Sequence, residues 1–265
     1  MPPRPGLPSL AGALAGPARR LGAALRRVAI EGRPAPPDGL GALKVAAIDR
    51  ACDLVAARSL ADLGGVWAVD GGYAFHAAAR PAVTRVALVD EDFTSTVVER
   101  AGRDGVVELV GGNFGDPAIA ARVGEVDIVL LFDVLLHQVR PDWDDVLDLY
   151  AARTRCFVIV QPTYAEAGPA VRLLDLGVES YLALVPDVPI HQEALARLDE
   201  PNERRGKPWR DVHDIWQWGI GDAALRAKLG ALGFELAHHE SAGRWRGLEH
   251  FDDSAYVFVR PGARG

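Results

Sequence analysis

Residues 66–76 read Val-Trp-Ala-Val-Asp-Gly-Gly-Tyr-Ala-Phe-His, and this stretch decides the fold that the sequence predicts. It predicts a short apolar strand over residues 66–69, a turn through Asp70, Gly71 and Gly72, and a helix from about Phe75. Glycine lets a backbone turn sharply and approach a ligand closely, and the first N–H groups of a helix are open to a ligand. The stretch therefore indicates the nucleotide-binding turn of an α/β protein.

A second predicted strand ends in acidic residues. The apolar run 85–89 is followed by Asp90, Glu91 and Asp92. In nucleotide-binding α/β folds, an acidic residue about 20 positions after the glycine turn binds the ribose hydroxyls. The turn and Asp90 together predict an adenosine-containing cofactor.

The composition is that of a folded protein with a substantial core, since 49% of the 265 residues are hydrophobic. The net charge of −7 argues against a general nucleic-acid-binding protein, which is usually basic. The two cysteines, Cys52 and Cys156, fit no metal-ligand spacing and no disulfide framework. No apolar run approaches the ~18 residues of a membrane span, and the first residues do not follow the pattern of a signal peptide. We therefore expect a cytoplasmic protein without a metal site.

Residues 1–40 differ from the rest of the chain in composition and charge. They are rich in Pro, Gly and Ala, and they carry six arginines and two acidic residues. The sequence predicts a flexible extension here, with a basic amphipathic helix from Pro17. Such a helix can lie on an anionic membrane surface, which predicts peripheral membrane contact through residues 17–30. The alternative is a helix that packs on the domain with its arginines in water.

Apolar strands alternate with helices through residues 41–265, which we predict to be one domain. The predicted strands are 66–69, 85–89, 106–110, 126–132 and 156–160, after a first helix over 43–59. A late helix over 222–232 precedes two strands, 234–239 and 255–259, with a long excursion between them. Five β–α repeats predict a parallel, doubly wound sheet. Residues 162–218 show no regular strand pattern, and so long an insertion is typical of a lid or substrate region.

This order of elements resembles the class I S-adenosylmethionine-dependent methyltransferases over about residues 60–260. In that family the sheet has seven strands, of which the last is inserted antiparallel. Asp70 and Gly72 match the first half of the family's glycine motif, whereas Ala74 and His76 depart from it. The resemblance implies an α/β fold with a doubly wound, seven-stranded, mostly parallel sheet, in which residues 162–218 form an insertion on the acceptor side.

Further motifs support the resemblance. Asp90 matches the family's ribose-binding acid, Asn113-Phe114 falls at its adenine-binding position, and residues 132–137 are similar to its fourth motif. Ligands in doubly wound sheets bind beyond the carboxyl ends of strands. The polar residues predicted at such ends are Asp70, Asp90, Asn113, Asp133 and Gln161. The resemblance thus implies S-adenosylmethionine as the cofactor. The residues that it assigns to cofactor binding are Asp70, Gly71, Gly72, Asp90, Glu91, Asn113, Phe114 and Phe132.

Methyl transfer to a hydroxyl group requires alignment of the reactants and a base that takes the proton. His137 is the first candidate for this base, because histidine titrates near neutral pH and this one follows the fourth predicted strand. Asp133 is the second candidate. The alternative for His137 is a structural role at the start of a helix.

The acceptor is predicted to bind against the insertion. Aromatic residues beside polar groups suit a sugar or another ring-bearing molecule, and cations suit a phosphate or carboxylate. The candidate residues are Tyr164, Arg210, His213 and Trp216. The resulting hypothesis is a small molecule, or a glycan- or lipid-linked acceptor, that is methylated at oxygen.

Two other functions use the same sequence features. An NAD-dependent reductase or epimerase would use the glycine turn and Asp90, but after Gly72 no glycine follows until Gly102, so the spacing of its glycine motif is missing. A non-catalytic binding subunit could keep the methyltransferase fold with an incomplete first motif.

Overall fold

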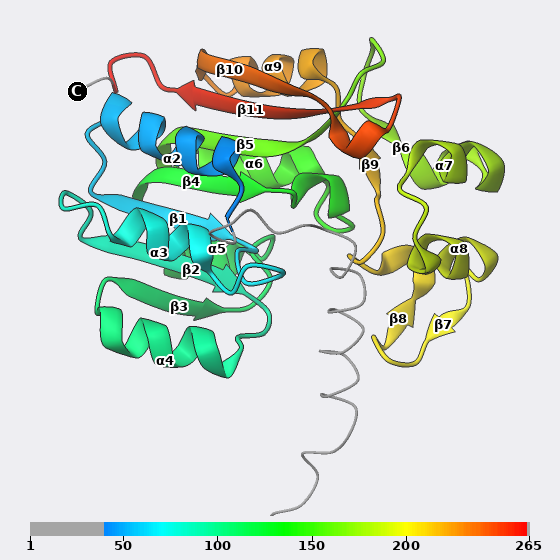
Figure 1. Ribbon diagram of the computed structural model, residues 1–265, viewed down its shortest axis with the longest axis horizontal. Helices are drawn as coiled ribbons and strands as arrows, with labels where there is room; N and C mark the ends of the chain where they lie inside the picture. The colour runs from blue at the N-terminus through cyan, green and yellow to red at the C-terminus, as the bar shows by residue number, and fades with distance from the viewer. Residues whose placement is uncertain (1–39, 264–265) are drawn as a thin grey trace, which may run out of the picture. The chain divides into compact units, whose positions relative to one another are not determined.

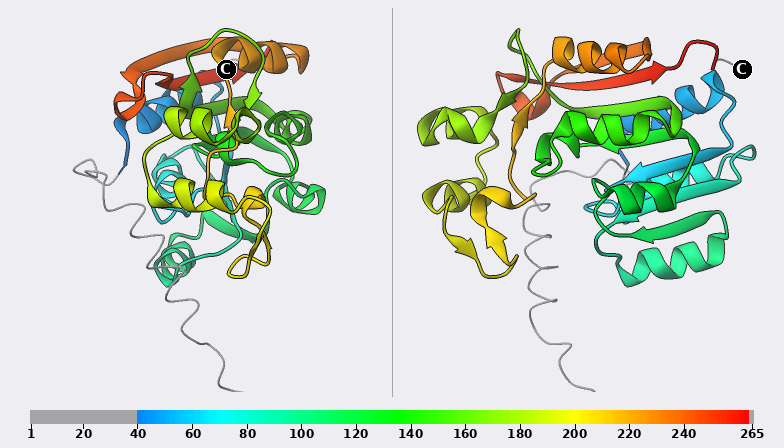
Figure 2. Two further views of the ribbon diagram at one scale, coloured as in Figure 1. Left: turned by 90° about the vertical axis from the view of Figure 1, so that its right-hand side faces the viewer. Right: turned by 180° about the vertical axis from the view of Figure 1, so that it is seen from behind.

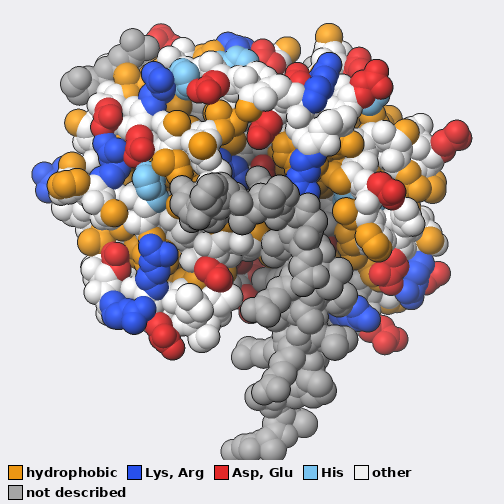
Figure 3. Space-filling model, viewed as in Figure 1, with side chains coloured by type: hydrophobic (Ala, Val, Ile, Leu, Met, Phe, Trp, Pro, Cys, Tyr) orange, Lys and Arg blue, Asp and Glu red, His pale blue; other side chains and the backbone are white. Residues whose placement is uncertain are grey.

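The computed structural model describes residues 40–263, all of which belong to the compact unit Ala35–Gly265. The predicted amphipathic helix and the membrane contact through residues 17–30 lie outside the described residues. Within residues 40–263, no helix has both the length and the apolar character needed to cross a membrane. Acidic and basic side chains are interspersed over the described part of the face drawn in Figure 3.

A seven-stranded sheet forms the centre of this unit (Figure 1). Its order is β10-β11-β5-β4-β1-β2-β3. Strands β1 to β5 run parallel, whereas β11 is antiparallel to both β5 and β10. The strands are β1 Ser59–Leu63, β2 Arg85–Asp90, β3 Val107–Gly111, β4 Val126–Phe132, β5 Thr154–Tyr164, β10 Glu235–Arg244 and β11 Phe251–Val259. The predicted fold class, a doubly wound, seven-stranded and mostly parallel sheet, is confirmed.

Helices cover both faces of the sheet. Helices α2, α3 and α4 pack on one face through residues such as Ile48, Phe75 and Val97. Helices α5, α6 and α9 pack on the other face, for example through Leu147 and Leu225. The helices are α2 Ala42–Leu54, α3 Gly72–Ala78, α4 Ser95–Asp104, α5 Pro117–Val123, α6 Trp143–Ala151 and α9 Asp222–Ala231. Because both faces are covered, a central strand such as β4 is almost wholly apolar and sends alternate side chains into the two cores.

The prediction of the first strand is wrong. Strand β1 is Ser59–Leu63, and helix α2 ends at Leu54, although the sequence predicts one helix over 43–59. Residues 66–70 form a turn, and Gly71, at a φ of 70°, precedes helix α3. The physical reason is Asp62, a carboxylic acid within β1, next to its last residue, that is only 1% exposed. A charged residue at this position hides a buried strand from any analysis of apolar runs.

Residues 171–219 fold into a small second layer, which we call the cap. It contains helices α7 Val178–Leu184 and α8 Pro189–Ala196 and two short antiparallel ladders, β6–β9 and β7–β8. The ladder strands are β6 Val171–Arg172, β7 Pro201–Asn202, β8 Lys207–Pro208 and β9 Trp218–Gly219. The cap has its own hydrophobic core, which also includes Leu136 and Phe251 from the sheet side. It lies beyond the carboxyl ends of the parallel strands (Figure 1, Figure 2).

The last two strands are longer than predicted. Strand β10 runs to Arg244 and β11 begins at Phe251, so the predicted long excursion is wrong, and a short turn through the 3-10 helix Trp245–Gly247 connects them. Strand β10 is an edge strand, and polar residues such as His239 and Glu240 continue it in place of an apolar run. The strand therefore has no clear hydrophobic alternation in the sequence.

Candidate functional site

The turn after β1 lies where the carboxyl ends of several strands meet. Gly64 has a φ of 76°, a conformation that favours glycine. Its N–H donates a hydrogen bond to the Val89 carbonyl of β2 at 2.8 Å. A Cβ atom on Gly64 would lie 2.8 Å from Val134 Cγ1 and 3.3 Å from Phe114 Cε1. The turn through Gly64 and Gly65 therefore allows β1, β3 and β4 to end close together, as a ligand site at this edge requires.

Asp70, Gly71 and Gly72 do not form this turn, which corrects the sequence-based placement. Asp70 precedes helix α3 and accepts a hydrogen bond from the Thr94 hydroxyl at 3.0 Å. Strand β1 is the strand that leads into the Gly64-Gly65 turn, and its acidic residue is Asp62. The sequence does contain a signal for this placement, because in Asp62-Leu63-Gly64 an acidic residue is followed two positions later by a glycine.

The Asp62 carboxyl group lies beneath the glycine turn. A side chain on Gly65 would overlap this carboxyl group, and within residues 40–263 Oδ2 has no hydrogen-bond partner. Burial, together with the charge of Asp90, raises the pKa of Asp62 to about 7, although Lys44 and the N–H of Ala74 oppose this rise. A carboxyl group that titrates near neutrality at a glycine turn is typical of functional sites.

Asp90 ends strand β2, as predicted, and lies beside the turn through Gly64 and Gly65 rather than beside Gly71-Gly72. Its Oδ2 accepts a hydrogen bond from the Val66 N–H at 3.1 Å, and its Oδ1 accepts one from the Glu91 N–H at 2.8 Å. The hydrogen bond to Val66 ties the end of β2 to the turn after β1. The carboxylate is thus fixed at the carboxyl edge of two neighbouring parallel strands.

Asn113 and Phe114 follow β3 and lie beside the same edge. The Asn113 Nδ2 amide donates to Glu91 Oε1 at 3.3 Å, and its Oδ1 accepts from the Gly115 N–H at 2.8 Å. Phe114 packs with the core beneath, and its ring approaches Gly64. The structure therefore brings Asp90, Glu91, Asn113 and Phe114 together, as the sequence predicts.

Asp133 follows β4 and binds a lysine that the sequence analysis missed. Its backbone has a φ of 54°, and its Oδ2 lies 2.5 Å from the Nζ of Lys44 in helix α2. The Lys44 ammonium lies 5.4 Å from the centre of the Tyr73 ring and 5.7 Å from that of Phe132. Lys44 lies in the helix before β1, and no motif includes it, so the sequence contains no signal for this pair.

His137 lies in the 3-10 helix Leu135–His137, between the sheet and the cap. Its Nδ1 lies 2.9 Å from the Ile215 carbonyl oxygen, which can only accept, so Nδ1 carries the hydrogen and Nε2 holds the lone pair. Burial lowers the pKa of His137, and the nearby carboxylates of Asp133 and Asp214 only partly offset this effect. The ring is therefore neutral at pH 7, with one nitrogen able to take a proton.

His213 lies beside His137, but the other acceptor candidates are elsewhere. The His213 Nδ1 lies 3.2 Å from the His137 carbonyl oxygen. Trp216 is only 5% exposed and packs on Trp245 and Phe251, so it belongs to the cap core and not to an open surface. Hydrophobic packing of the cap, which no local pattern shows, places Trp216 away from the surface that the sequence predicts for it.

Arg210 and Tyr164 are also engaged outside this cluster. Arg210 is exposed and forms an ion pair with Asp199 on the cap. Tyr164 ends β5, packs on Phe251 and lines a cavity of about 270 Å³ between β5, α9, β10 and β11. Gln161 is not at a strand end, since β5 continues to Tyr164, and it is fully buried.

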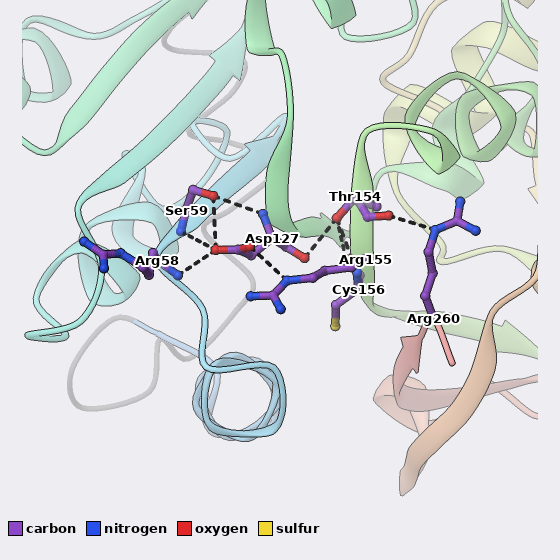
Figure 4. Close-up of polar contacts among 7 residues, drawn as sticks. All are labelled: Arg58, Ser59, Asp127, Thr154, Arg155, Cys156 and Arg260. Carbon is purple, nitrogen blue, oxygen red and sulfur yellow. Dashed lines mark hydrogen bonds and ion pairs between the residues drawn. The ribbon is translucent and has the colours of Figure 1, made fainter. Parts of the chain in front are cut away.

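A polar network lies at the opposite, amino end of the strands (Figure 4). Asp127 Oδ2 accepts hydrogen bonds from the N–H groups of Arg58 and Ser59 at 2.7 and 3.0 Å, and Oδ1 accepts from Arg155 at 2.9 Å. Burial alone would raise the pKa of Asp127, but these donors outweigh it and hold the pKa below its usual value. The network joins β1, β4 and β5 and has a structural role.

Replacing Asp127 by alanine is expected to lower the free energy of unfolding by about 1–3 kcal/mol at pH 7, because it removes the charged acceptor of the Arg58, Ser59 and Arg155 donors. Since the folded-state pKa is depressed, the stabilisation is present above the unfolded-state pKa and is lost as pH falls through the folded-state pKa. Urea unfolding at pH 7 and at pH 3 measures both effects. Glu125→Ala, an exposed acid beside the same network, is the control and should change stability little. Equal stabilities of the two variants would contradict the assignment.

Comparison with known proteins identifies the fold. No family model matches the sequence, and no curated protein matches it. Solved structures resemble it at low identity. The N-terminal domain of EvdMO1, crystallised with S-adenosylhomocysteine (SAH) and D-fucose, is 14% identical with a TM-score of 0.54, over 91% of this chain and 97% of that chain.

Two proteins of Burkholderia thailandensis are similar as well. The 1,6-didemethyltoxoflavin-N1-methyltransferase, solved with 1,6-didemethyltoxoflavin and SAH, is 16% identical with a TM-score of 0.54, over 94% of this chain and 93% of that chain. An O-methyltransferase family protein is 14% identical with a TM-score of 0.51, over 92% of this chain and 59% of that chain. At these identities the comparisons establish a shared fold.

Proposed function

We propose that this chain, whose fold is that of the class I S-adenosylmethionine-dependent methyltransferases, binds S-adenosylmethionine at the carboxyl ends of β1–β4 and transfers its methyl group to a small molecule. The observation that carries the proposal is the position of Asp90. Its carboxylate is fixed at the end of β2 by the Val66 N–H of the glycine turn. Two carboxylate oxygens at such a strand end suit the adjacent hydroxyls of a ribose.

The residues around Asp90 suit the rest of an adenosine. The Phe114 ring lies beside Gly64, where an adenine could pack against it, and the Asn113 side chain offers an amide for its polar edge. Asp62 lies beneath the turn, and its carboxyl group would favour a cationic ligand when ionised. The comparison structures solved with SAH support this choice of cofactor.

The cofactor would supply an electrophilic sulfonium methyl group, so the protein needs to align the acceptor and remove a proton. His137 fits the second task, because its ring is neutral and its Nδ1–H is bound to the Ile215 carbonyl, which leaves Nε2 as a proton acceptor. Its position between β4 and the cap suits an acceptor bound there. Oxygen is the proposed methylated atom, because a hydroxyl group is the acceptor that needs such a base, and a small hydroxylated or glycan-linked molecule is the proposed class.

Calorimetric titration of the purified protein with SAH and with NADH tests the proposal. We expect SAH to bind and NADH not to bind. Binding of NADH alone would favour the reductase or epimerase, and binding of neither would favour a non-catalytic subunit. The same titration can then be repeated on variants.

Replacing Asp90 by alanine is expected to weaken SAH binding roughly tenfold or more, because it removes charge-assisted hydrogen bonds to the ribose. Glu99→Ala, an exposed acid on helix α4, is the matched control and should bind like the wild type. Isothermal calorimetry at one ionic strength measures both variants. Unchanged affinity of Asp90→Ala would show that the ribose does not lie at the end of β2.

A further inference from the structure

Lys44 is a buried cation in the wall of the candidate site. It lies in the first turn of helix α2, is only 8% exposed and faces the rings of Tyr73 and Phe132. Removing an ammonium group from water costs several kcal/mol unless partners replace the water. A lysine at this position therefore needs an explanation from its partners.

The described partners of Lys44 do not use all of its donors. An ammonium group has three N–H donors. Among residues 40–263 the Nζ atom makes one hydrogen bond, to Asp133 Oδ2 at 2.5 Å. Its other two contacts are to ring faces, which attract the charge but do not accept an N–H in the way an oxygen does. Within residues 40–263, two donors of this nearly buried cation thus have no hydrogen-bond acceptor.

The ammonium lies on the side of the candidate cofactor site. Phe132 ends β4 and Asp133 follows it, while Tyr73 belongs to the first turn of α3. The Lys44 charge also acts on Asp62 beneath the glycine turn. Asp62 is the penultimate residue of β1, and Asp90 is the last residue of the neighbouring strand β2. Lys44 therefore brings a positive charge to the edge that carries the carboxyl groups of Asp62 and Asp90, next to two apolar ring faces that shield it from water.

We propose that Lys44 is the oxyanion-binding residue of this site, which takes a carboxylate or an ionised oxygen of a bound small molecule while Asp133 holds the third donor. The proposal rests on the proposed function. Two ligands could supply the oxyanion, namely the amino-acid carboxylate of the cofactor and an acidic oxygen of the acceptor. A charge-assisted hydrogen bond in a partly buried site is strong enough to decide affinity in either case.

The test compares ligands that do and do not carry the carboxylate. SAH and 5′-methylthioadenosine share the nucleoside and the thioether, but only SAH has the amino-acid group. Each is titrated into the wild type, Lys44→Met and Lys44→Gln, of which Gln keeps a donor for Asp133 without the charge. Lys228→Met is the control, because Lys228 forms surface ion pairs with Asp144 and Asp148 away from the site.

Loss of a charged hydrogen bond is expected to weaken binding roughly 10- to 100-fold. If this loss affects SAH and not 5′-methylthioadenosine, Lys44 binds the cofactor carboxylate. If SAH binding is unchanged, the SAH complexes are titrated with 4-hydroxybenzoate, which carries a carboxylate and a phenol. Binding by the wild type and loss in both Lys44 variants would assign Lys44 to the acceptor.

Other outcomes overturn the proposal. Equal affinities of variants and wild type for SAH and for 4-hydroxybenzoate would show that the Lys44–Asp133 pair only fastens α2 to β4. An equal loss for SAH and 5′-methylthioadenosine would overturn it too, since no oxyanion would then be involved. A wild type that binds no SAH would instead refute the proposed function.

Discussion

Replacing His137 by alanine is expected to lower kcat roughly 100-fold or more, while the affinity for SAH stays close to that of the wild type. The reason is that the residues proposed to bind the cofactor and the proposed base lie at different strand ends. The residues proposed to hold the adenosine lie at the ends of β1–β3, whereas His137 lies after β4 against the cap. The measurement is the rate of SAH formation from S-adenosylmethionine with an acceptor found in a screen of small hydroxylated molecules.

The pH dependence of the wild type provides a second readout for His137. Burial lowers its pKa below the usual 6.5 in the unliganded protein, so the neutral form persists to lower pH and the acid limb of kcat/KM should lie below that value. His76→Ala is the control, because His76 is half-buried on helix α3 and bound to Asp49. Full activity of His137→Ala, with an unchanged acid limb, would remove His137 as the base.

Replacing Asp62 by asparagine is expected to remove a pH dependence from the stability of the unliganded protein. Asp62 has a folded-state pKa of about 7 and a usual value of 3.8, so the folded protein binds its proton more tightly than the unfolded chain does. Stability should therefore fall as pH rises from about 4 to 7, and the full loss should be present above 7. We expect this loss to be on the order of 2–4 kcal/mol in the wild type.

Urea unfolding at pH 5 and pH 8 measures the effect. The difference between the two pH values should shrink in Asp62→Asn but not in Asp104→Asn, which changes an exposed acid at the end of helix α4. Asp62→Asn should also bind SAH more weakly at pH 8, because it lacks the negative charge. If its unfolding free energy depends on pH as in the wild type, Asp62 does not titrate near neutrality.

The sheet could be predicted largely from the sequence, because most of its strands are buried on both faces and read as apolar runs. Strands β2, β4 and β5 show this directly. Strand β1 is buried as well, but Asp62 interrupts its run. The error that follows is a shift of the whole glycine turn, from Gly64-Gly65 to Gly71-Gly72. Polar residues inside buried strands are often found at functional sites. The fold is therefore hardest to predict from the sequence at the place where we propose the function.

The sequence predicts those residues of the candidate site that directly end or follow a strand, because the order of the strands along the chain fixes where they lie. Asp90 ends β2, and Asn113 and Asp133 follow β3 and β4. The carboxyl ends of neighbouring parallel strands meet at one edge of the sheet. Lys44 reaches the same edge from a helix that precedes β1, so only the packing of α2 on the sheet brings it there. Trp216 is the opposite case. In the sequence this aromatic residue among polar ones suits a ligand-binding surface, but the structure buries it in the core of the cap.

A crystal structure of the protein with bound SAH tests the central claim most directly. We predict that the ribose hydroxyls bind the Asp90 carboxylate, that the adenine lies beside Asn113 and Phe114, and that the homocysteine end passes the turn at Gly64. Density for SAH away from the carboxyl ends of β1–β4, or a ribose with no contact to Asp90, would contradict the account.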